Sequence, residues 1–249
     1  MAELRHRRKF ELFDMQFKRV LIKISGELFS LNGSNNEPIN QICTNILNVI
    51  SSGIDVSIVV GGGNIIRGSR FQNNNSIRRE TADSIGMLAT VMNGIILRDN
   101  LLNRGVDCAI VSALDLPFNI RKLNSFVIEE LISQHRTIII VGGLGVPYFS
   151  TDTVSVVGAT LSCCDAILKA SNTDGIYDKD PHKHADAVFL EKITYEFAIQ
   201  HNLQVMDETA FLLARNLNKP IYVFSSTEPN CFIRAINNEI KCSIVSAKL

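Results

Sequence analysis

This sequence of 249 residues lacks several features, and each absence excludes a class of protein. Lysine plus arginine and aspartate plus glutamate both number 25, so the formal net charge is zero. A general nucleic-acid-binding protein usually has a strong basic excess, so nucleic acid is not an expected partner. No apolar run approaches the ~20 residues that a membrane-spanning helix needs, so no membrane contact is expected.

Cysteine patterns typical of zinc or disulfide sites are also absent. No CxxC pair occurs, and no histidine lies at metal-ligand spacing near a cysteine. The cysteines are therefore predicted to be buried free thiols in a reducing, cytoplasmic compartment. The six are Cys43, Cys108, Cys163, Cys164, Cys231 and Cys242.

The first fourteen residues differ in character from the rest of the chain. A basic cluster at residues 5–9 is followed by a short apolar segment that is too small for a signal-peptide core. We expect residues 1–14 to form a flexible arm, followed by a single domain over residues 15–249. Met15, just before the first predicted strand, is an alternative translation start that the sequence leaves open.

Strand-like apolar runs alternate with segments of helical spacing along most of the chain. The predicted strands span residues 19–24, 55–60, 107–111, 137–141, 166–169, 221–224 and 243–245. The predicted helices span residues 39–50, 82–103, 126–132, 153–163 and 207–217. This alternation predicts an α/β fold with a mainly parallel central sheet and helices on both faces.

Two of the predicted strands end in loops that contain glycine. Strand 55–60 is followed by three glycines at residues 61–63, and strand 19–24 is followed by Ser-Gly at residues 25–26. Glycine allows backbone N–H groups to approach a bound anion closely. The carboxyl ends of parallel strands meet at one edge of a sheet, where ligands bind. The two loops therefore predict a site for a phosphorylated ligand.

Lys23 lies inside an otherwise apolar strand and adds a cation to this edge. A buried, unpaired ammonium group is costly, so it should emerge at the strand end, where it can meet a phosphate. Instead of binding phosphate, Lys23 could form an ion pair at the sheet edge. The glycines at residues 61–63 could likewise form only a tight turn between strand and helix. Neither a Walker A loop nor a GxGxxG dinucleotide motif occurs in the sequence.

Two further segments carry polar residues at the predicted ligand edge. Ser150, Thr151 and Asp152 precede a predicted helix, whose N-terminus favours anions, although each of them would also serve as an ordinary N-cap. The acidic, turn-rich segment 171–181 lacks the spacing of an EF-hand. Its aromatic and hydroxyl side chains suit a nucleoside better than calcium.

Five segments, in this order along the chain, resemble the bacterial uridylate (UMP) kinase family, which has the amino acid kinase fold, a three-layer sandwich. They are Lys23-Ile24-Ser25-Gly26-Glu27, Gly61-Gly62-Gly63-Asn64-Ile65-Ile66-Arg67-Gly68, the run at residues 82–93 (ADSIGMLATVMN), Asp174-Gly175-Ile176-Tyr177 with Asp180-Pro181, and Val205-Met206-Asp207. The run at residues 82–93 is the most specific. The glycine loops are shared with aspartate, glutamate, acetylglutamate and carbamate kinases.

The resemblance implies transfer of the ATP γ-phosphoryl group to UMP in pyrimidine nucleotide biosynthesis, with Mg²⁺ entering on the ATP phosphates. It also implies a homohexamer, in which the long helix 82–103 is a candidate dimer element. The implied ATP-binding residues are Lys23, Ile24, Ser25, Gly26, Gly63, Arg67, Ser171, Tyr177 and Asp180. The implied UMP-binding residues are Gly62, Asp83, Leu144, Gly145, Val146, Pro147, Tyr148, Phe149, Ser150 and Thr151. The implied catalytic residues are Lys23, Arg67, Asp152 and Asp207.

The chain departs from the family pattern at two positions, and two other functions stay open. Leu144 and Val146 stand where the family usually has threonine and asparagine, which removes two side chains able to bond the nucleoside. One alternative is an amino acid or carbamate kinase of the same fold, although Asp83 would repel an acidic acceptor. The other is a non-catalytic nucleotide-sensing regulator, in which the basic arm would touch nucleic acid.

Overall fold

A computed structural model describes residues 17–29, 37–66 and 77–248. Arg67 and the predicted arm at residues 1–14 lie outside the described residues. The strands are β1 (Arg19–Ile24), β2 (Asp55–Val60), β3 (Cys108–Ser112), β4 (Arg121–Lys122), β5 (Thr137–Val141), β6 (Ala166–Ser171), β7 (Ile176–Tyr177), β8 (Phe189–Leu190), β9 (Lys192–Thr194), β10 (Ile221–Ser225) and β11 (Cys242–Ser246). The helices are η1 (Gly26–Leu28, a 3-10 turn), α1 (Glu37–Ser51), α2 (Arg79–Leu102), α3 (Ser125–Ser133), α4 (Thr151–Leu161), α5 (Tyr195–Gln200), α6 (Glu208–Asn216) and α7 (Cys231–Ile236).

The main sheet has nine strands in the order β4-β3-β5-β2-β1-β6-β10-β11-β9. All neighbouring strands pair in parallel except β10 and β11, which are antiparallel. A separate two-stranded sheet pairs β7 with β8. The predicted α/β fold with a mainly parallel central sheet is confirmed.

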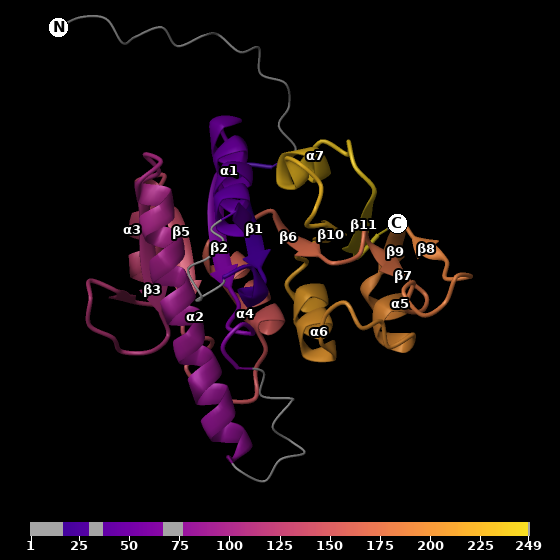
Figure 1. The fold of residues 1–249 in the computed structure, drawn as a ribbon, viewed down its shortest axis with the longest axis horizontal. Coiled ribbons are helices and arrows are strands. Elements are labelled where there is room, and N and C mark those ends of the chain that lie inside the picture. Colours follow the sequence, from indigo (N-terminus) through magenta and orange to yellow (C-terminus); the bar gives the residue numbers. More distant parts are fainter. Residues whose placement is uncertain (1–16, 30–36, 67–76, 249) are drawn as a thin grey trace, which may run out of the picture.

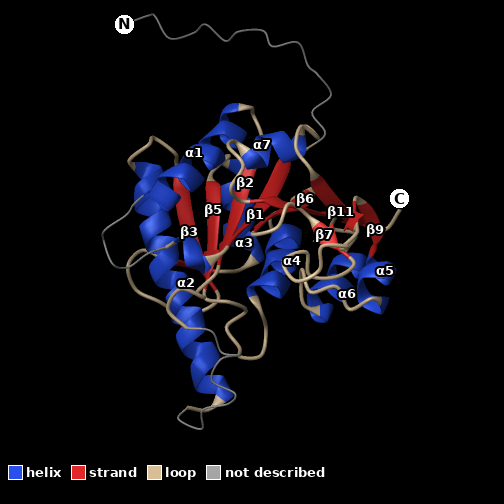
Figure 2. Cartoon of the chain, turned by 45° about the vertical axis from the view of Figure 1, so that its right-hand side comes forward, coloured by secondary structure: helices blue, strands red, loops and turns tan. Residues whose placement is uncertain are grey.

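Helices cover both faces of this sheet, which makes three layers (Figures 1 and 2). One hydrophobic cluster joins α1, α2 and α7 to one face, and a second joins α3, α4, α5 and α6 to the other. Successive side chains of a strand point to opposite faces. Val20 and Ile22 therefore pack toward α1, whereas Leu21 packs on the side of α4. Lys23 has the same parity as Leu21, which directs it to the α4 side.

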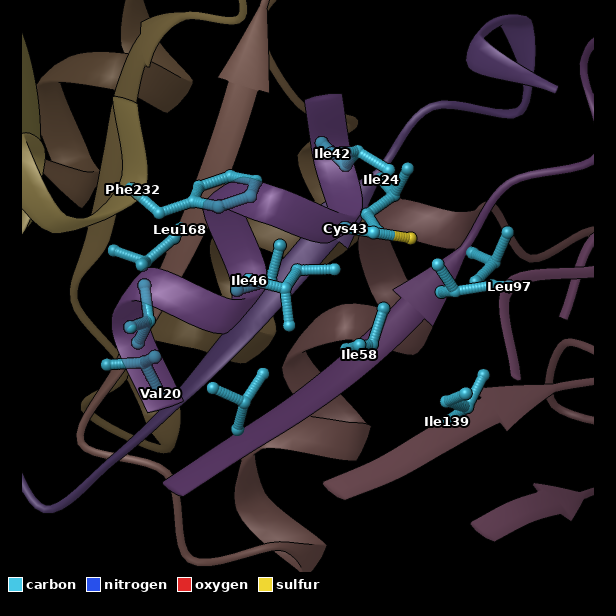
Figure 3. Packing of buried hydrophobic residues seen from close by; sticks show 14 of the residues in the cluster. Val20, Ile24, Ile42, Cys43, Ile46, Ile58, Leu97, Ile139, Leu168 and Phe232 are labelled. Atoms are coloured by element: carbon cyan, nitrogen blue, oxygen red, sulfur yellow. The ribbon is translucent and has the colours of Figure 1, made fainter. Parts of the chain in front are cut away.

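The core under α1 shows why these segments form one sheet (Figure 3). Ile42, Cys43 and Ile46 of α1 are almost fully buried, and they belong to the same cluster as Ile24 and Ile58 of the central strands. Burying a large aliphatic side chain contributes roughly 1.5–3 kcal/mol. The apolar stripe of α1 therefore fixes β1 and β2 side by side, which places their two glycine loops together.

All seven predicted strands and all five predicted helices are present, with boundaries that differ by up to three residues. The sequence did not predict the strands β4, β7, β8 and β9, each of two or three residues. It also did not predict the short helices α5 and α7. Such short segments hold too few residues to reveal a period. Five cysteines are buried as expected, but Cys163 is exposed, which corrects that prediction.

Helix α2 combines an apolar composition with a role in the core. Within the described ranges it is the one helix long and apolar enough, by length and composition alone, to suit a membrane span. It packs against β2, β3 and β5, and it contains buried Leu97 and Leu101. Packing against the sheet accounts for much of its apolar character.

Gly62 packs too closely against α2 to accept a side chain. A Cβ atom there would lie 2.6 Å from the carbonyl oxygen of Gly86 and 2.8 Å from Cβ of Ala89. A Gly62→Ala variant should therefore lose about 1–3 kcal/mol of unfolding free energy by overpacking. Urea unfolding of Gly62→Ala and of the wild-type protein measures this difference in unfolding free energy.

Gly86 offers the matched control on the same helix. A Cβ atom at Gly86 would meet only Cγ2 of Ile66, at an ordinary 3.7 Å. Gly86→Ala should therefore stabilise α2 by about 0.5–1 kcal/mol through helix propensity. Equal stabilities for the two alanine variants would contradict the close contact at Gly62.

Candidate active site

The carboxyl ends of β1, β2 and β5 border a cleft of about 530 Å³. Its lining comes from the two glycine loops, the first turns of α2 and α4, and the loop that precedes α4. The lining residues include Lys23, Ser25, Gly26, Gly61, Gly62, Gly63, Arg79, Asp83, Met87, Gly143, Tyr148, Phe149, Ser150, Thr151, Thr153 and Asp207. Segments that are distant in sequence thus converge at one edge of the sheet, as the sequence predicts.

Asp152, in the first turn of α4, lies between two lysines from neighbouring strands. Lys23 of β1 and Lys169 of β6 stand opposite each other in the parallel register. The ammonium nitrogen of Lys169 donates to both carboxylate oxygens of Asp152 at 2.9 Å and also to the carbonyl of Val205. The nitrogen of Lys23 lies 3.3 Å from the same carboxylate. All three side chains are at most 17% exposed.

Burial and charge act against each other in this cluster. Burial raises the pKa of Asp152, but the ammonium groups of Lys169 and Lys23 outweigh it and hold that pKa below its usual value. Burial lowers the pKa of Lys169 to about 8, with the Asp152 carboxylate opposing the shift and Lys23 adding to it. Lys169 is therefore a cation at neutral pH that begins to lose its proton in mildly alkaline solution.

Lys169 was not among the residues singled out from the sequence. The sequence placed it at the end of a predicted strand, and its signal was the same as that of Lys23: a lysine at the carboxyl end of an apolar strand. Only the parallel pairing of β1 with β6 shows that the two lysines share one carboxylate.

Asp207 holds hydroxyl groups and caps a helix. Its carboxylate accepts from the hydroxyl of Ser150, from Thr153 Oγ1 at 3.3 Å, and from the backbone N–H of Ala210 at 2.9 Å, which caps α6. Ser150 in turn caps α4 by accepting from the N–H groups of Asp152 and Thr153. Asp207 therefore fixes the N-terminus of α4 at the cleft, and it makes no direct ion pair with Lys23 or Lys169 among the described contacts.

The glycine loops touch each other through their backbones. A Cβ atom on Gly26 would lie 2.6 Å from the backbone nitrogen of Gly63 and 2.7 Å from the carbonyl oxygen of Gly61. The buried amide of Asn93 on α2 donates to the carbonyl of Gly61 at 2.8 Å and exchanges hydrogen bonds with the amide of Asn64. The loop after β2 is thus anchored to α2, and its three glycines carry no side chains that could cover the backbone amides.

The far end of the cleft is closed by contacts between α2 and the loop before α4. Asp83 pairs with Arg79 at 2.8 Å and accepts from the backbone N–H of Tyr148 at 2.9 Å. The hydroxyl of Tyr148 donates to Glu80, and the guanidinium of Arg79 lies 5.7 Å from the centre of its ring. The Glu80 contact raises the pKa of the tyrosine hydroxyl. This group of side chains brings one acidic residue, Asp83, into the cleft lining.

A second pocket, of about 780 Å³, lies on the other side of the lysine pair. Its lining includes Asp152, Lys169, Val205 and much of segment 171–181. Lys23 lines the first cleft, and the ion pairs of Asp152 connect it to the lining of the second pocket. Two separate molecules can therefore approach the same pair of cations from opposite sides.

Most residues predicted for the site lie in one of these two pockets. Ser171, Tyr177 and Asp180 line the second pocket, and the first cleft contains Lys23, Ser25, Gly26, Gly62, Gly63, Asp83, Tyr148, Phe149, Ser150, Thr151 and Asp207. Ile24 presents no side chain to either, because it is 1% exposed in the opposite core and its carbonyl accepts from Gly61.

The predicted uridine segment is only partly in place. Leu144 packs against the core beside α4, and Gly145, Val146 and Pro147 are outside the described lining of the first cleft. Val146 is 49% exposed. The segment therefore faces the cleft through its second half, Tyr148 to Thr151, so the replacements at positions 144 and 146 fall outside the lining described.

The carboxylates of the site fit a metal that enters with a ligand better than one caged by the protein. Asp152 is occupied by two ammonium groups, and Asp207 is occupied by hydroxyls and a backbone N–H. No group of three or more His, Cys, Asp or Glu side chains suited to a metal ion occurs in residues 17–29, 37–66 and 77–248. Mg²⁺ is commonly held through substrate phosphates with one or two carboxylates.

Cations and backbone amides gathered between two pockets suit the transfer of a charged group from one bound molecule to another, which is the chemistry of kinases. Residues 18–225 match the amino acid kinase family, so the chain belongs to that family.

Within this family, the chain falls among the bacterial uridylate kinases. It is 39% identical over 224 residues to the uridylate kinase of Francisella tularensis subsp. holarctica, which covers 89% of this chain and 90% of that protein. It is 37% identical to the uridylate kinase of Acinetobacter baylyi over 90% of this chain and 94% of that one. The solved structure of UMP kinase from Ureaplasma parvum superposes with a TM-score of 0.86 at 36% identity, covering 93% of this chain and 100% of that one.

Proposed function

We propose that this chain transfers the γ-phosphoryl group of ATP to UMP, which yields UDP and ADP. The observation that carries the proposal is the lysine pair on Asp152, which connects the two pockets. The names of the similar proteins support UMP as the acceptor and a kinase as the class of enzyme.

The proposed arrangement places one nucleotide in each pocket with their phosphates facing. The adenosine of ATP occupies the second pocket beside Ser171, Tyr177 and Asp180, and UMP occupies the far end of the first cleft beside Asp83. The phosphates then meet where Lys23 and Lys169 converge. Holding the two reactants end to end converts a bimolecular step into an effectively unimolecular one.

The side chains at the junction stabilise charge. The phosphate of UMP is already ionised at neutral pH, so the acceptor needs no strong general base. Lys23, Lys169 and the N-terminus of α4 supply positive potential where negative charge spreads over the transferring group. Asp152 holds the two ammonium groups in place and offsets their mutual repulsion. Mg²⁺ bound to the ATP phosphates would neutralise further charge there.

Neither alternative function gains support from a particular observation. An amino acid or carbamate kinase needs a pocket for a small acidic acceptor, whereas Asp83 adds a carboxylate to the cleft lining. A non-catalytic regulator has no need for two lysines on one buried carboxylate, an arrangement that costs desolvation energy. The basic arm that suggested nucleic acid lies outside the described residues.

A coupled assay for ADP tests the proposal and the place of Asp83 together. UMP, CMP, aspartate, glutamate and carbamate are offered separately, and UMP should have the highest kcat/KM. Asp83→Asn should raise KM for UMP about tenfold, the effect of weakening one charged hydrogen bond, and leave KM for ATP unchanged.

Glu80→Gln is the matched control for Asp83→Asn. It disturbs the contact to the Tyr148 hydroxyl and lies outside the described cleft lining, so KM for UMP should stay within about twofold. Preference for another acceptor would overturn the proposal. Equal changes in the two KM values of Asp83→Asn would remove Asp83 from the UMP side.

Assembly, compartment and pathway complete the proposal. Ile85, Leu88 and Met92 form an exposed apolar stripe on α2, 37–49% exposed, which supports burial of this face between subunits of a homohexamer. The six free cysteines support a cytoplasmic location. Formation of UDP would place the enzyme in pyrimidine nucleotide biosynthesis.

A further inference from the structure

One wall of the second pocket comes from a segment that the main sheet does not hold. Gly175, Ile176 and Tyr177 line this pocket, and β7 pairs only with β8, in the small sheet. A strand of two residues in a two-stranded sheet is weakly fixed by its own hydrogen bonds. Other contacts must therefore determine where the Tyr177 ring stands.

Those contacts come from the C-terminal strand, far away in sequence. The ammonium nitrogen of Lys241, directly before β11, donates to Asp174 Oδ2 and to the hydroxyl of Tyr177, both at 2.9 Å. That hydroxyl donates in turn to Asp174 Oδ1 at 2.6 Å. The same nitrogen lies 5.2 Å from the ring centre of Tyr177 and 4.2 Å from that of Phe189 on β8. One cation thus touches both strands of the small sheet.

The backbone beside this cation is also docked on β11. Ser243 Oγ accepts from the backbone N–H of Ile176 at 2.8 Å, in a buried contact. A Cβ atom on Gly175 would lie 2.6 Å from that oxygen and 2.4 Å from the Phe189 ring. The pocket segment therefore rests directly against β11, and Lys241 closes one side of the contact.

We propose that Lys241 is a positioning residue for the nucleoside end of ATP, which it serves through Asp174 and Tyr177. Lys241 and Asp174 are outside the described lining of the second pocket, so they act on the ligand through Tyr177, which lines it. This inference rests on the proposed function, because it takes the second pocket as the ATP side. Its contacts leave the lysine pair at Asp152 untouched, so they bear on ATP binding and not on the chemical step.

The expected effect of Lys241 on ATP binding is moderate, because its ion pair with Asp174 is partly exposed to solvent. Lys241 and Asp174 are 47% and 44% exposed, so solvent screens their ion pair. Cation–π contact with two rings and the shared tyrosine hydroxyl add to it. The hydrogen bonds to Tyr177 and Asp174 raise the pKa of Lys241, so the side chain stays charged through the neutral range. Loss of this charge should raise KM for ATP about three- to tenfold.

Kinetics of three variants of the full chain test the proposal. Lys241→Met keeps the aliphatic stem but loses the charge, Lys241→Ala loses both, and Lys241→Arg keeps the charge. The first two should raise KM for ATP, leaving kcat at saturating ATP and KM for UMP within about twofold. Lys241→Arg should restore most of the ATP affinity. Lys192→Ala, at an exposed lysine on the neighbouring strand β9, is the control expected to change nothing.

Calorimetric titration with ATP alone separates this inference from the proposed function. A weaker Kd for ATP in Lys241→Met than in the wild-type protein supports it even if UMP proves to be the wrong acceptor. Equal Kd and KM values for ATP in Lys241→Met and the wild type would overturn it. Parallel losses in kcat and both KM values, unrelieved in Lys241→Arg and with a lowered Tm, would also overturn it by showing a general structural role.

Discussion

Replacement of Lys23 by alanine is expected to lower kcat about 10²–10³-fold, the range found when one charge-stabilising donor is removed from a transition state. Lys23 is the cation that lines the first cleft at the point where it meets the second pocket. The loss should appear in kcat, with both KM values changed much less, because the contact strengthens as charge develops on the transferring group.

The fold should survive the loss of Lys23. Lys169 makes the closer contacts with Asp152, so the carboxylate keeps a partner. The unfolding midpoint should therefore shift by only a few degrees. Lys18→Ala, at an exposed lysine directly before the opposite end of β1, is the matched control and should leave kcat unchanged. A kcat near the wild-type value in Lys23→Ala would remove Lys23 from the chemical step.

Asp152→Asn is expected to change both the activity and its dependence on pH. In the wild-type protein, kcat/KM should fall as pH rises through about 8, because Lys169 of the free enzyme then loses its proton. The Asp152 carboxylate raises the pKa of Lys169 against the effect of burial. Its removal should lower that pKa further, so the alkaline limb of the kcat/KM profile should move to lower pH.

The same substitution should destabilise the protein, and acid should diminish the difference. Removing one partner of a buried ion pair costs about 3–5 kcal/mol while the other partner stays charged. Asp152 has a lowered pKa in the folded protein, so its contribution is present above its unfolded pKa and is lost as pH falls through the folded value. Urea unfolding at neutral and acidic pH should show a gap between Asp152→Asn and wild type that narrows in acid.

Lys169 contributes to the pH dependence of stability with the same sign as Asp152 but in alkaline solution, because its pKa is also lowered in the folded protein. Its pKa of about 8 in the folded protein lies below the ordinary 10.5, so the unfolded chain binds more protons between these values. The unfolding free energy of the wild-type protein should therefore increase as pH rises from about 8 toward 10.5.

The activity profiles of the two proteins test the role of Lys169. If activity falls at the same alkaline pH in the wild-type protein and in Asp152→Asn, Lys169 does not govern the activity.

Much of the architecture and one edge of the site could be predicted from local patterns. The strand that contains Lys23 and the strand that is followed by three glycines were both placed correctly, because buried strands are continuous apolar runs that stop near glycine. Ser150 was rightly counted among the candidate N-caps of α4. These features depend on neighbouring residues alone, so a single sequence displays them.

Other parts of the site depend on contacts between distant residues and left little local signal. In the register of β1 and β6, Lys23 lies opposite Lys169, which is 146 positions further along the chain. The resemblance implied a catalytic role for Asp207, and the structure shows that its carboxylate also holds Ser150 and Thr153 at the N-terminus of α4. Leu144 packs, partly buried, against the core cluster on the α4 side, and the two glycines before it have positive φ.

By itself, the amino-acid order determined the alternation of strands and helices, the glycine-rich strand ends and the kinship with uridylate kinases, since periodicity and motifs are properties of neighbouring residues. Tertiary structure alone decided that Asp152 lies between two lysines and that Lys241 holds the wall of the second pocket. The physical reason is that an ion pair needs proximity in space, and proximity here comes from sheet order and helix packing, which no local pattern encodes.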